Sequence, residues 1–144
     1  MKTLSRSEDI IIVDGDILHR YIFKSDYVPS RNEARTSAFL PQNKYPNELS
    51  VYLQRELTLE QIWDIGYQYV GVYKGGSQPK ATGELIASDV KRIKNDVLDK
   101  YLSLHPLYEP HRYHTNIANV QTSSPKDLLI AEKLLKIAKI IPRE

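Results

Sequence analysis

The sequence predicts one α+β domain, with a mainly antiparallel sheet of five or six strands and two or three helices, the C-terminal helix packed on the sheet. The length of 144 residues suits a single domain. Short runs of β-branched and aromatic residues alternate with turn residues, which is typical of strands. The clearest helical pattern lies near the C-terminus. Residues 1–9 are polar and are expected to form a flexible N-terminus, so the domain would span residues 10–144.

The first expected element is a β-hairpin. Residues 10–13 and 17–23 are rich in β-forming side chains and flank Asp14-Gly15-Asp16. Asp and Gly tolerate the backbone angles of tight turns, so this tripeptide predicts the turn. Alternation along a strand divides the second run between two faces. One face carries Ile17, His19, Tyr21 and Phe23, and the other carries Leu18, Arg20 and Ile22.

The middle of the chain predicts two strands, a helix and a further strand. Residues 36–40 are a candidate short strand within an irregular stretch, and residues 48–53 form the next strand. Thr58-Leu59-Glu60-Gln61 matches a capping box and predicts a helix that ends near Gly66. Residues 67–73 return to β-forming side chains. The strand at 48–53 is expected to place Leu49, Val51 and Leu53 on one face and Glu48, Ser50 and Tyr52 on the other.

The last third of the chain predicts an alternation of short strands and helices. Residues 84–87 are expected to be extended and residues 88–93 to form a short helix. Residues 97–104 fit either a strand or a continuation of that helix. Residues 115–120 predict a final strand. An amphipathic helix follows, capped by Ser124 with Pro at its first position, and it is expected to reach about Ile141.

Composition excludes several classes of protein. The absence of cysteine excludes a disulfide scaffold, a Cys nucleophile and thiolate metal sites. The net charge of +2 is too small to indicate a nucleic-acid or membrane partner without a local patch. No apolar run reaches the roughly 7–15 residues of a secretory signal or the about 20 of a membrane helix. We therefore expect a cytoplasmic protein without a cofactor and without a membrane partner.

His111 and His114, with Glu109 nearby, are the most concentrated polar group of the sequence. Imidazoles at this spacing can bind a metal ion from one side of a turn. However, the HExxH signature is absent, and Pro110 disfavours a regular helix here. A polar cluster that hydrogen-bonds the loop backbone is therefore favoured, and no metal site is predicted.

Arg20 lies within an expected strand, where a half-buried charge needs a partner. Glu48 is the preferred partner, because a carboxylate accepts a bidentate pair from arginine. The functional alternative is that Arg20 grips an anionic ligand such as a phosphate. Ser37, Ser50 and Ser103 are candidate nucleophiles by residue type, but no GxSxG or SxxK motif surrounds them. A Ser–His hydrolase is therefore not predicted.

Five short segments carry a resemblance to known sequences. They are Arg20, Ser37-Ala38-Phe39, Glu48-Leu49-Ser50-Val51, His114-Thr115-Asn116-Ile117 and the closing helix after Ser124. In this order, over roughly residues 18–141, the chain resembles a set of short bacterial proteins without an assigned activity, often encoded near conflict and defence genes. The resemblance implies that Arg20, Glu48, Ser50, His114 and Asn116 cluster in space. The longer stretch at residues 94–113 departs from the pattern.

The Arg-led opening and the Ser37-Ala38-Phe39 segment also resemble small NAD-using ADP-ribosyltransferase-like toxins. That resemblance implies a small split sheet and an early Arg or His that grips NAD together with a later Glu. It does not place the catalytic Glu in this chain.

Three functions are therefore carried forward. The first is a non-enzymatic accessory protein of a bacterial operon, linked to defence, that binds another protein. The second is a small enzyme of the ADP-ribosyl-transfer or nucleotide-processing type, with Arg20, Glu48 and His114 as candidate catalytic residues. The third is an RNA or DNA binder that uses its ten tyrosines for stacking. The residues expected to bind a ligand are Arg20, Ser50, His111 and Asn116.

Overall fold

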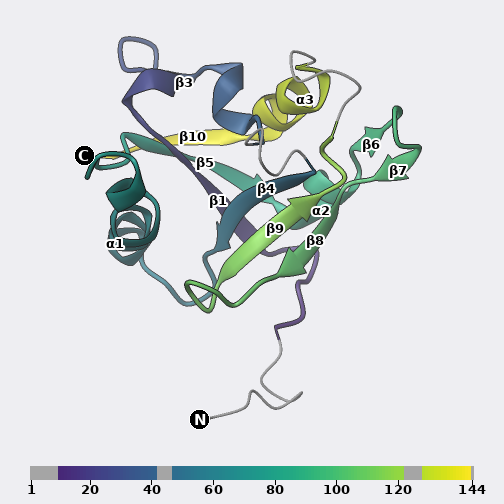
Figure 1. Cartoon of the computed structure of the whole chain (residues 1–144), viewed down its shortest axis with the longest axis horizontal. Helices are drawn as coiled ribbons and strands as arrows, with labels where there is room; N and C mark the ends of the chain where they lie inside the picture. Colours follow the sequence, from purple (N-terminus) through teal and green to yellow (C-terminus); the bar gives the residue numbers. More distant parts are fainter. Residues whose placement is uncertain (1–9, 42–46, 122–127, 144) are drawn as a thin grey trace.

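A six-stranded antiparallel sheet forms the centre of the described part of the protein (Figure 1). The computed structural model describes residues 10–41, 47–121 and 128–143. The strand order is β10-β5-β1-β4-β9-β8, and every neighbouring pair is antiparallel, which confirms the predicted sheet. The strands are β1 (Ile17–Ile22), β4 (Glu48–Leu53), β5 (Ala81–Ile86), β8 (Ser103–Pro106), β9 (His114–Ala118) and β10 (Lys139–Pro142).

Helices cover parts of both faces of this sheet. The C-terminal helix contacts β5 and the 3-10 helix η3, which confirms its predicted packing on the sheet. The α-helices of the described residues are α1 (Leu59–Tyr69), α2 (Ala87–Lys91) and α3 (Leu129–Ile137). The 3-10 helices are η2 (Lys24–Asp26), η3 (Thr36–Phe39) and η4 (Gly71–Tyr73). Two small ribbons, β2 (Tyr27–Val28) with β3 (Glu33–Ala34) and β6 (Lys94–Asn95) with β7 (Lys100–Tyr101), lie outside the sheet.

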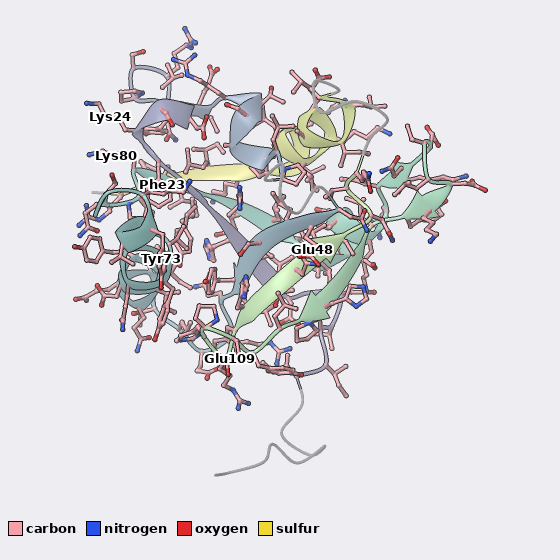
Figure 2. All side chains as sticks on the ribbon, viewed as in Figure 1. Phe23, Lys24, Glu48, Tyr73, Lys80 and Glu109 are labelled. Atoms are coloured by element: carbon pink, nitrogen blue, oxygen red, sulfur yellow. The ribbon has the colours of Figure 1, made fainter. Side chains whose placement is uncertain are left out.

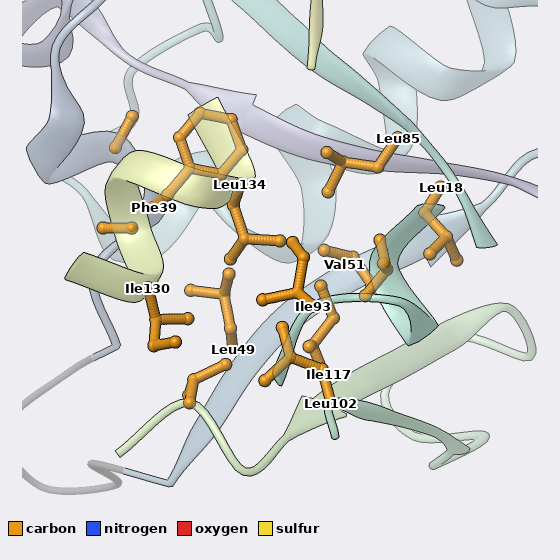
Figure 3. Close-up of a cluster of buried hydrophobic side chains, with 14 of the residues drawn as sticks. Leu18, Phe39, Leu49, Val51, Leu85, Ile93, Leu102, Ile117, Ile130 and Leu134 are labelled. Carbon is orange, nitrogen blue, oxygen red and sulfur yellow. The ribbon is translucent and has the colours of Figure 1, made fainter. Parts of the chain in front are cut away.

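Two hydrophobic clusters hold these layers together. The larger cluster packs α3 and η3 against the sheet (Figure 3), and burying each large aliphatic side chain contributes roughly 1.5–3 kcal/mol. The smaller cluster packs α1 against the opposite face through Tyr21, Tyr52 and Ile62. The alternation predicted for β4 agrees with this arrangement. The larger cluster includes Leu18, Phe39, Leu49, Val51, Leu85, Ile117, Ile130 and Leu134.

The strands β1 and β4 share only a short stretch of backbone pairing. These strands pair only at Leu18 with Leu53 and at His19 with Tyr52. By contrast, β1 pairs with β5 along the whole of Ile17–Ile22. Beyond the two shared pairs, β1 and β4 part (Figure 1). Backbone groups that face this opening need partners from elsewhere, since an unpaired buried carbonyl costs free energy.

Two predicted strands in the first half of the chain are wrong. Residues 10–13 are not a strand, although the turn after them is present. The turn is instead closed by Asp16, whose carboxylate accepts from the Val13 N–H at 2.8 Å and pairs with Arg55 at 2.7 Å. Thr36–Phe39 is a 3-10 helix, which lets Ala38 and Phe39 enter the core together.

The predicted end of α1 at Gly66 is also wrong. The capping box at Thr58 is confirmed, but the helix continues through Gly66 to Tyr69, so residues 67–73 are not a strand. Gly66 is required for packing: a Cβ there would lie 2.4 Å from Cε1 of Tyr21. Position 66 is therefore a glycine because α1 and β1 pack closely there, and not because the helix ends there.

The C-terminal segment differs from its prediction in one respect. The helix α3 ends at Ile137, and Lys139–Pro142 forms the edge strand β10 beside β5, because backbone pairing with β5 replaces the last helical turn. The predicted cap Ser124 and the expected flexible residues 1–9 lie outside the described residues. Residues 97–104, left open between strand and helix, are extended at β7 and β8. Over the described ranges, no helix is long and apolar enough to cross a bilayer.

Candidate functional site

The even-numbered side chains of β4 and β9 form one row of polar groups. Ser50 lies opposite Asn116, and Tyr52 lies opposite His114. Side chains directly opposite each other in an antiparallel pair share a face of the sheet. The sheet pairing therefore brings together segments more than sixty residues apart.

Arg20 fills the opening between β1 and β4. Its Nε donates to the Ala38 carbonyl at 2.8 Å, and its Nη1 donates to the Ser50 carbonyl at 3.0 Å. No ion pair joins Arg20 to Glu48 in the described structure, so the expected salt bridge is wrong. The physical reason is that main-chain carbonyls of η3 and β4 take the guanidinium hydrogens that a carboxylate would otherwise accept. Burial lowers the pKa of Arg20 to about 10, and the charge of Asp26 opposes this, so Arg20 remains a cation at neutral pH.

Ser50 and His114 are in direct contact. The distance from Ser50 Oγ to His114 Nε2 is 2.5 Å. On the other side of the ring, His114 Nδ1 lies 2.5 Å from the carbonyl oxygen of Glu109. Burial lowers the pKa of His114, although the hydrogen bond to the Glu109 carbonyl and the charge of Glu48 act in the opposite direction. The ring is therefore neutral at pH 7.

Two adjoining clefts open at this point. We call the first the polar cleft; its volume is about 220 Å³. It is lined by Arg20, Pro41, Glu48, Leu49, Ser50, Leu107, His114 and Asn116. This set includes all five residues that the sequence resemblance expected to cluster.

The second cleft has a volume of about 340 Å³, and we call it the aromatic cleft. Besides Arg20, Ser50 and His114, which it shares with the polar cleft, its lining includes the cation Lys74 and the anion Asp26. Figure 2 shows Phe23 and Tyr73 on the α1 side of the molecule and Glu48 over the sheet. The aromatic side chains of its wall are Tyr21, Phe23, Tyr52, Tyr69 and Tyr73.

Ring contacts fix part of the aromatic wall. Tyr52 stacks on His114 with ring centroids 5.0 Å apart, and its centroid lies 5.6 Å from that of Tyr21. Burial raises the pKa of Tyr52 to about 12, so its hydroxyl stays neutral at physiological pH. By contrast, Tyr73 is 84% exposed and offers a free ring face to an incoming ligand.

His111 is the predicted ligand-binding residue that lines neither cleft. Its Nδ1 accepts from the Tyr113 N–H at 3.0 Å, and its ring contacts Tyr52 and Tyr69 from behind the aromatic cleft. Burial lowers the pKa of His111, with a smaller effect from His114. This contact with the loop backbone agrees with the polar cluster expected for His111 and His114. The described residues contain no group of three or more side chains suited to a metal ion.

Sequence reasoning missed most of the aromatic wall. Tyr52 was detectable, because it alternates with Glu48 and Ser50 along β4. Tyr69 and Tyr73 had no local signal, since they reach the cleft only because α1 continues past Gly66 and η4 follows it.

Comparison with known proteins adds no relative to this description. No protein-family model matches the chain, and no curated protein or solved structure is significantly similar to it. A function must therefore be inferred from the residues of the two clefts.

Proposed function

We propose that this protein is a small enzyme that binds a dinucleotide of the NAD type across the two clefts and acts on it. One observation carries the proposal: a fixed cation, Arg20, lies where a tyrosine-lined cleft meets a second, polar cleft. A dinucleotide has the matching layout, with a pyrophosphate between two nucleosides. This is the second of the three functions considered from the sequence.

The charge of Arg20 supports binding of the pyrophosphate. Two main-chain carbonyls hold its Nε and Nη1, which leaves donors of the guanidinium free for a ligand. Because the side chain is already ordered, little conformational entropy is lost when an anion binds. Lys74 adds a second cation in the aromatic cleft, with its Nζ 5.4 Å from the centre of the Phe23 ring.

The tyrosines support binding of a base. Aromatic side chains stack on any nucleobase, and each such contact contributes roughly 1–3 kcal/mol. The exposed ring of Tyr73 lines the aromatic cleft and is available for such a contact. The two clefts, of about 220 and 340 Å³, adjoin at Arg20, Ser50 and His114. A ligand of dinucleotide size would occupy both, since ligand pockets measure roughly 300–1,000 Å³.

The polar cleft supports recognition of a sugar. Glu48 offers carboxylate acceptors, and Asn116 offers both an acceptor and donors, on neighbouring strands of the same cleft. Ribose hydroxyls need partners of both kinds. Glu48 therefore takes the place of the later acidic residue that the resemblance to ADP-ribosyltransferase-like toxins implies.

Calorimetric titration with orthophosphate, AMP and NAD tests the proposal. NAD is expected to bind most tightly, AMP less tightly and orthophosphate least, because each successive ligand fills less of the two clefts. Arg20→Gln should weaken NAD binding about 10- to 100-fold, as expected for loss of a charge-assisted contact. Incubation with NAD should release nicotinamide, which chromatography resolves. Arg92→Gln is the matched control, because Arg92 is exposed and lines neither cleft.

A second variant tests the same proposal in case Arg20→Gln does not fold. Lys74 is exposed, so Lys74→Gln should leave the fold intact and weaken NAD binding several-fold. Equal affinities for NAD and orthophosphate, or unchanged NAD binding in both variants, would contradict the proposal. Tight NAD binding without release of nicotinamide would show that the protein binds NAD and would contradict the proposal that it acts on NAD as an enzyme.

The other functions remain predictions. The exposed large apolar side chains include Tyr67 of α1, Val72 and Tyr73 of η4, and Tyr101 of β7. The link to bacterial defence, the cytoplasmic location and nucleic-acid binding rest on the sequence. Co-purification from the native host would identify a protein partner.

A further inference from the structure

The contact between Ser50 and His114 has a defined direction of proton donation. A carbonyl oxygen only accepts hydrogen bonds, so the contact with Glu109 places a proton on His114 Nδ1. In a neutral ring, Nε2 is then an acceptor. The Ser50 hydroxyl must therefore donate to Nε2. This is the arrangement in which a histidine can remove the proton of a serine.

A third group fixes the orientation of the base. In serine enzymes, an acceptor on the far nitrogen holds the imidazole in the right tautomer. Here the main-chain carbonyl of Glu109 does so, and Tyr52 stacks on the ring at 5.0 Å. Burial lowers the pKa of His114, which keeps the base unprotonated at neutral pH.

The position of Ser50 also suits a nucleophile. Ser50 is exposed and lines both clefts, so a ligand in either cleft reaches the Ser50 hydroxyl. Arg20 is bonded to the carbonyl of the same residue at 3.0 Å. A cation beside the nucleophile stabilises negative charge that develops on an attacked ester.

We infer that Ser50 is a catalytic nucleophile, activated by His114 as general base, that acts on esters bound at the junction of the two clefts. The inference goes beyond the proposed function, because it rests on the contacts of Ser50, His114 and Glu109 and not on the identity of a nucleotide. It differs from the expectation from sequence, which did not predict a Ser–His hydrolase because no GxSxG or SxxK motif surrounds these serines.

With a carboxylic ester as substrate, Ser50 and His114 transfer the acyl group in two stages. Ser50 Oγ forms a bond to the carbonyl carbon, and its proton passes to His114 Nε2. The bond from that carbon to the alcohol oxygen breaks, and the alcohol leaves with the proton from Nε2. Water then gives a proton to Nε2 and attacks the acyl-serine, which releases the acid and restores the Ser50 hydroxyl.

Labelling with diisopropyl fluorophosphate tests the nucleophile directly. Attack by Ser50 forms an oxygen–phosphorus bond and expels fluoride, and intact-mass measurement should show one adduct that peptide mapping places on Ser50. Ser50→Ala should remove the adduct. This variant keeps the main-chain carbonyl that holds Arg20, so the protein should fold, which its circular dichroism spectrum checks. Ser103→Ala is the control and should label at the unchanged rate.

A second readout follows turnover. Mixing the protein with p-nitrophenyl acetate should release p-nitrophenol in a burst that is lost in Ser50→Ala and kept in Ser103→Ala. Absence of any adduct on the folded wild-type protein would overturn the inference. So would an adduct on another residue, or equal labelling of Ser50→Ala. None of these outcomes depends on whether NAD binds, so this test and that of the proposed function fail separately.

Discussion

The sheet carries two serine–histidine contacts, and their surroundings differ. Ser50 Oγ lies 2.5 Å from His114 Nε2, and Ser103 Oγ lies 2.8 Å from His105 Nε2. The register places Ser50, Asn116 and His105 side by side on neighbouring strands, so both contacts belong to one face of the sheet. Ser50 and His114 line both the polar and the aromatic cleft, whereas Ser103 and His105 line neither of these two.

The second difference concerns the far nitrogen of each histidine. His114 Nδ1 is held by the Glu109 carbonyl, whereas His105 Nδ1 has no hydrogen-bond partner among the described residues. His105 is exposed on the edge strand β8 and can rotate or change tautomer. A short serine–histidine distance alone therefore does not define a reactive pair. A fixed tautomer, a neighbouring cation and a cleft for the ligand are also needed.

The largest expected effect separates the two histidines. His114→Gln should slow labelling by diisopropyl fluorophosphate about 100-fold or more, because general bases typically contribute 10²- to 10⁴-fold. His105→Gln should change the rate less than about two-fold, since its histidine has neither a fixed tautomer nor a cleft. Intact-mass measurement of adduct formation against time gives both rates. Similar losses in the two variants would remove the distinction between the pairs.

The next effect concerns Arg20, which accompanies only the Ser50–His114 pair. Arg20→Gln leaves the carbonyls of Ala38 and Ser50 without their donor. The free energy of unfolding should therefore fall by about 1–3 kcal/mol. Urea denaturation measures it. Arg92→Gln should change it by less than about 0.5 kcal/mol, because the Arg92 contact with Asp89 is exposed. Equal stability of the two variants would show that the opening between β1 and β4 does not need Arg20.

The smallest effect is a shift of a pH profile. Labelling of Ser50 should be complete at pH 7 and fall as the pH drops below the pKa of His114, since a protonated ring cannot accept the serine proton. The pKa of His114 is lowered by burial and raised in part by Glu48, with Arg20, His111 and Tyr52 as the other nearby groups.

Glu48→Gln removes an anion that favours the charged ring. The midpoint of the labelling profile should therefore move to lower pH. Ellipticity measured at each pH excludes unfolding, which low pH also favours because buried His19 must then take up a proton. A midpoint that moves to higher pH would contradict the assigned role of Glu48.

Local patterns predicted several elements of the fold. The alternation of 48–53 and the capping box at Thr58 are both present, because each depends on neighbouring residues only. The end of α1 was not predictable from Gly66. A glycine is needed there because the ring of Tyr21, forty-five positions earlier, leaves no room for a side chain. The strand β10 was likewise missed, because its helical pattern is overridden by pairing with β5.

The candidate site was predicted in part. The residues Arg20, Glu48, Ser50, His114 and Asn116 do line one cleft, and four of them alternate along two strands. The partners of Arg20 were not predictable, because they are two main-chain carbonyls, Ala38 on η3 and Ser50 on β4. Every residue has a main-chain carbonyl, so the residue types do not show which carbonyl accepts a hydrogen bond from a given side chain.

The α+β class, the alternating faces of the central strands and the absence of cysteine could be read from the amino-acid order alone. Periodicity depends on residues close together in the chain, and composition does not depend on the fold, so both can be read from the sequence. The folded chain was needed to show that Ser50 contacts His114, that Glu109 orients the ring and that the tyrosines of α1 and η4 line a cleft with Arg20. These contacts join residues far apart in the chain, and their geometry depends on how the strands pair and where the sheet opens.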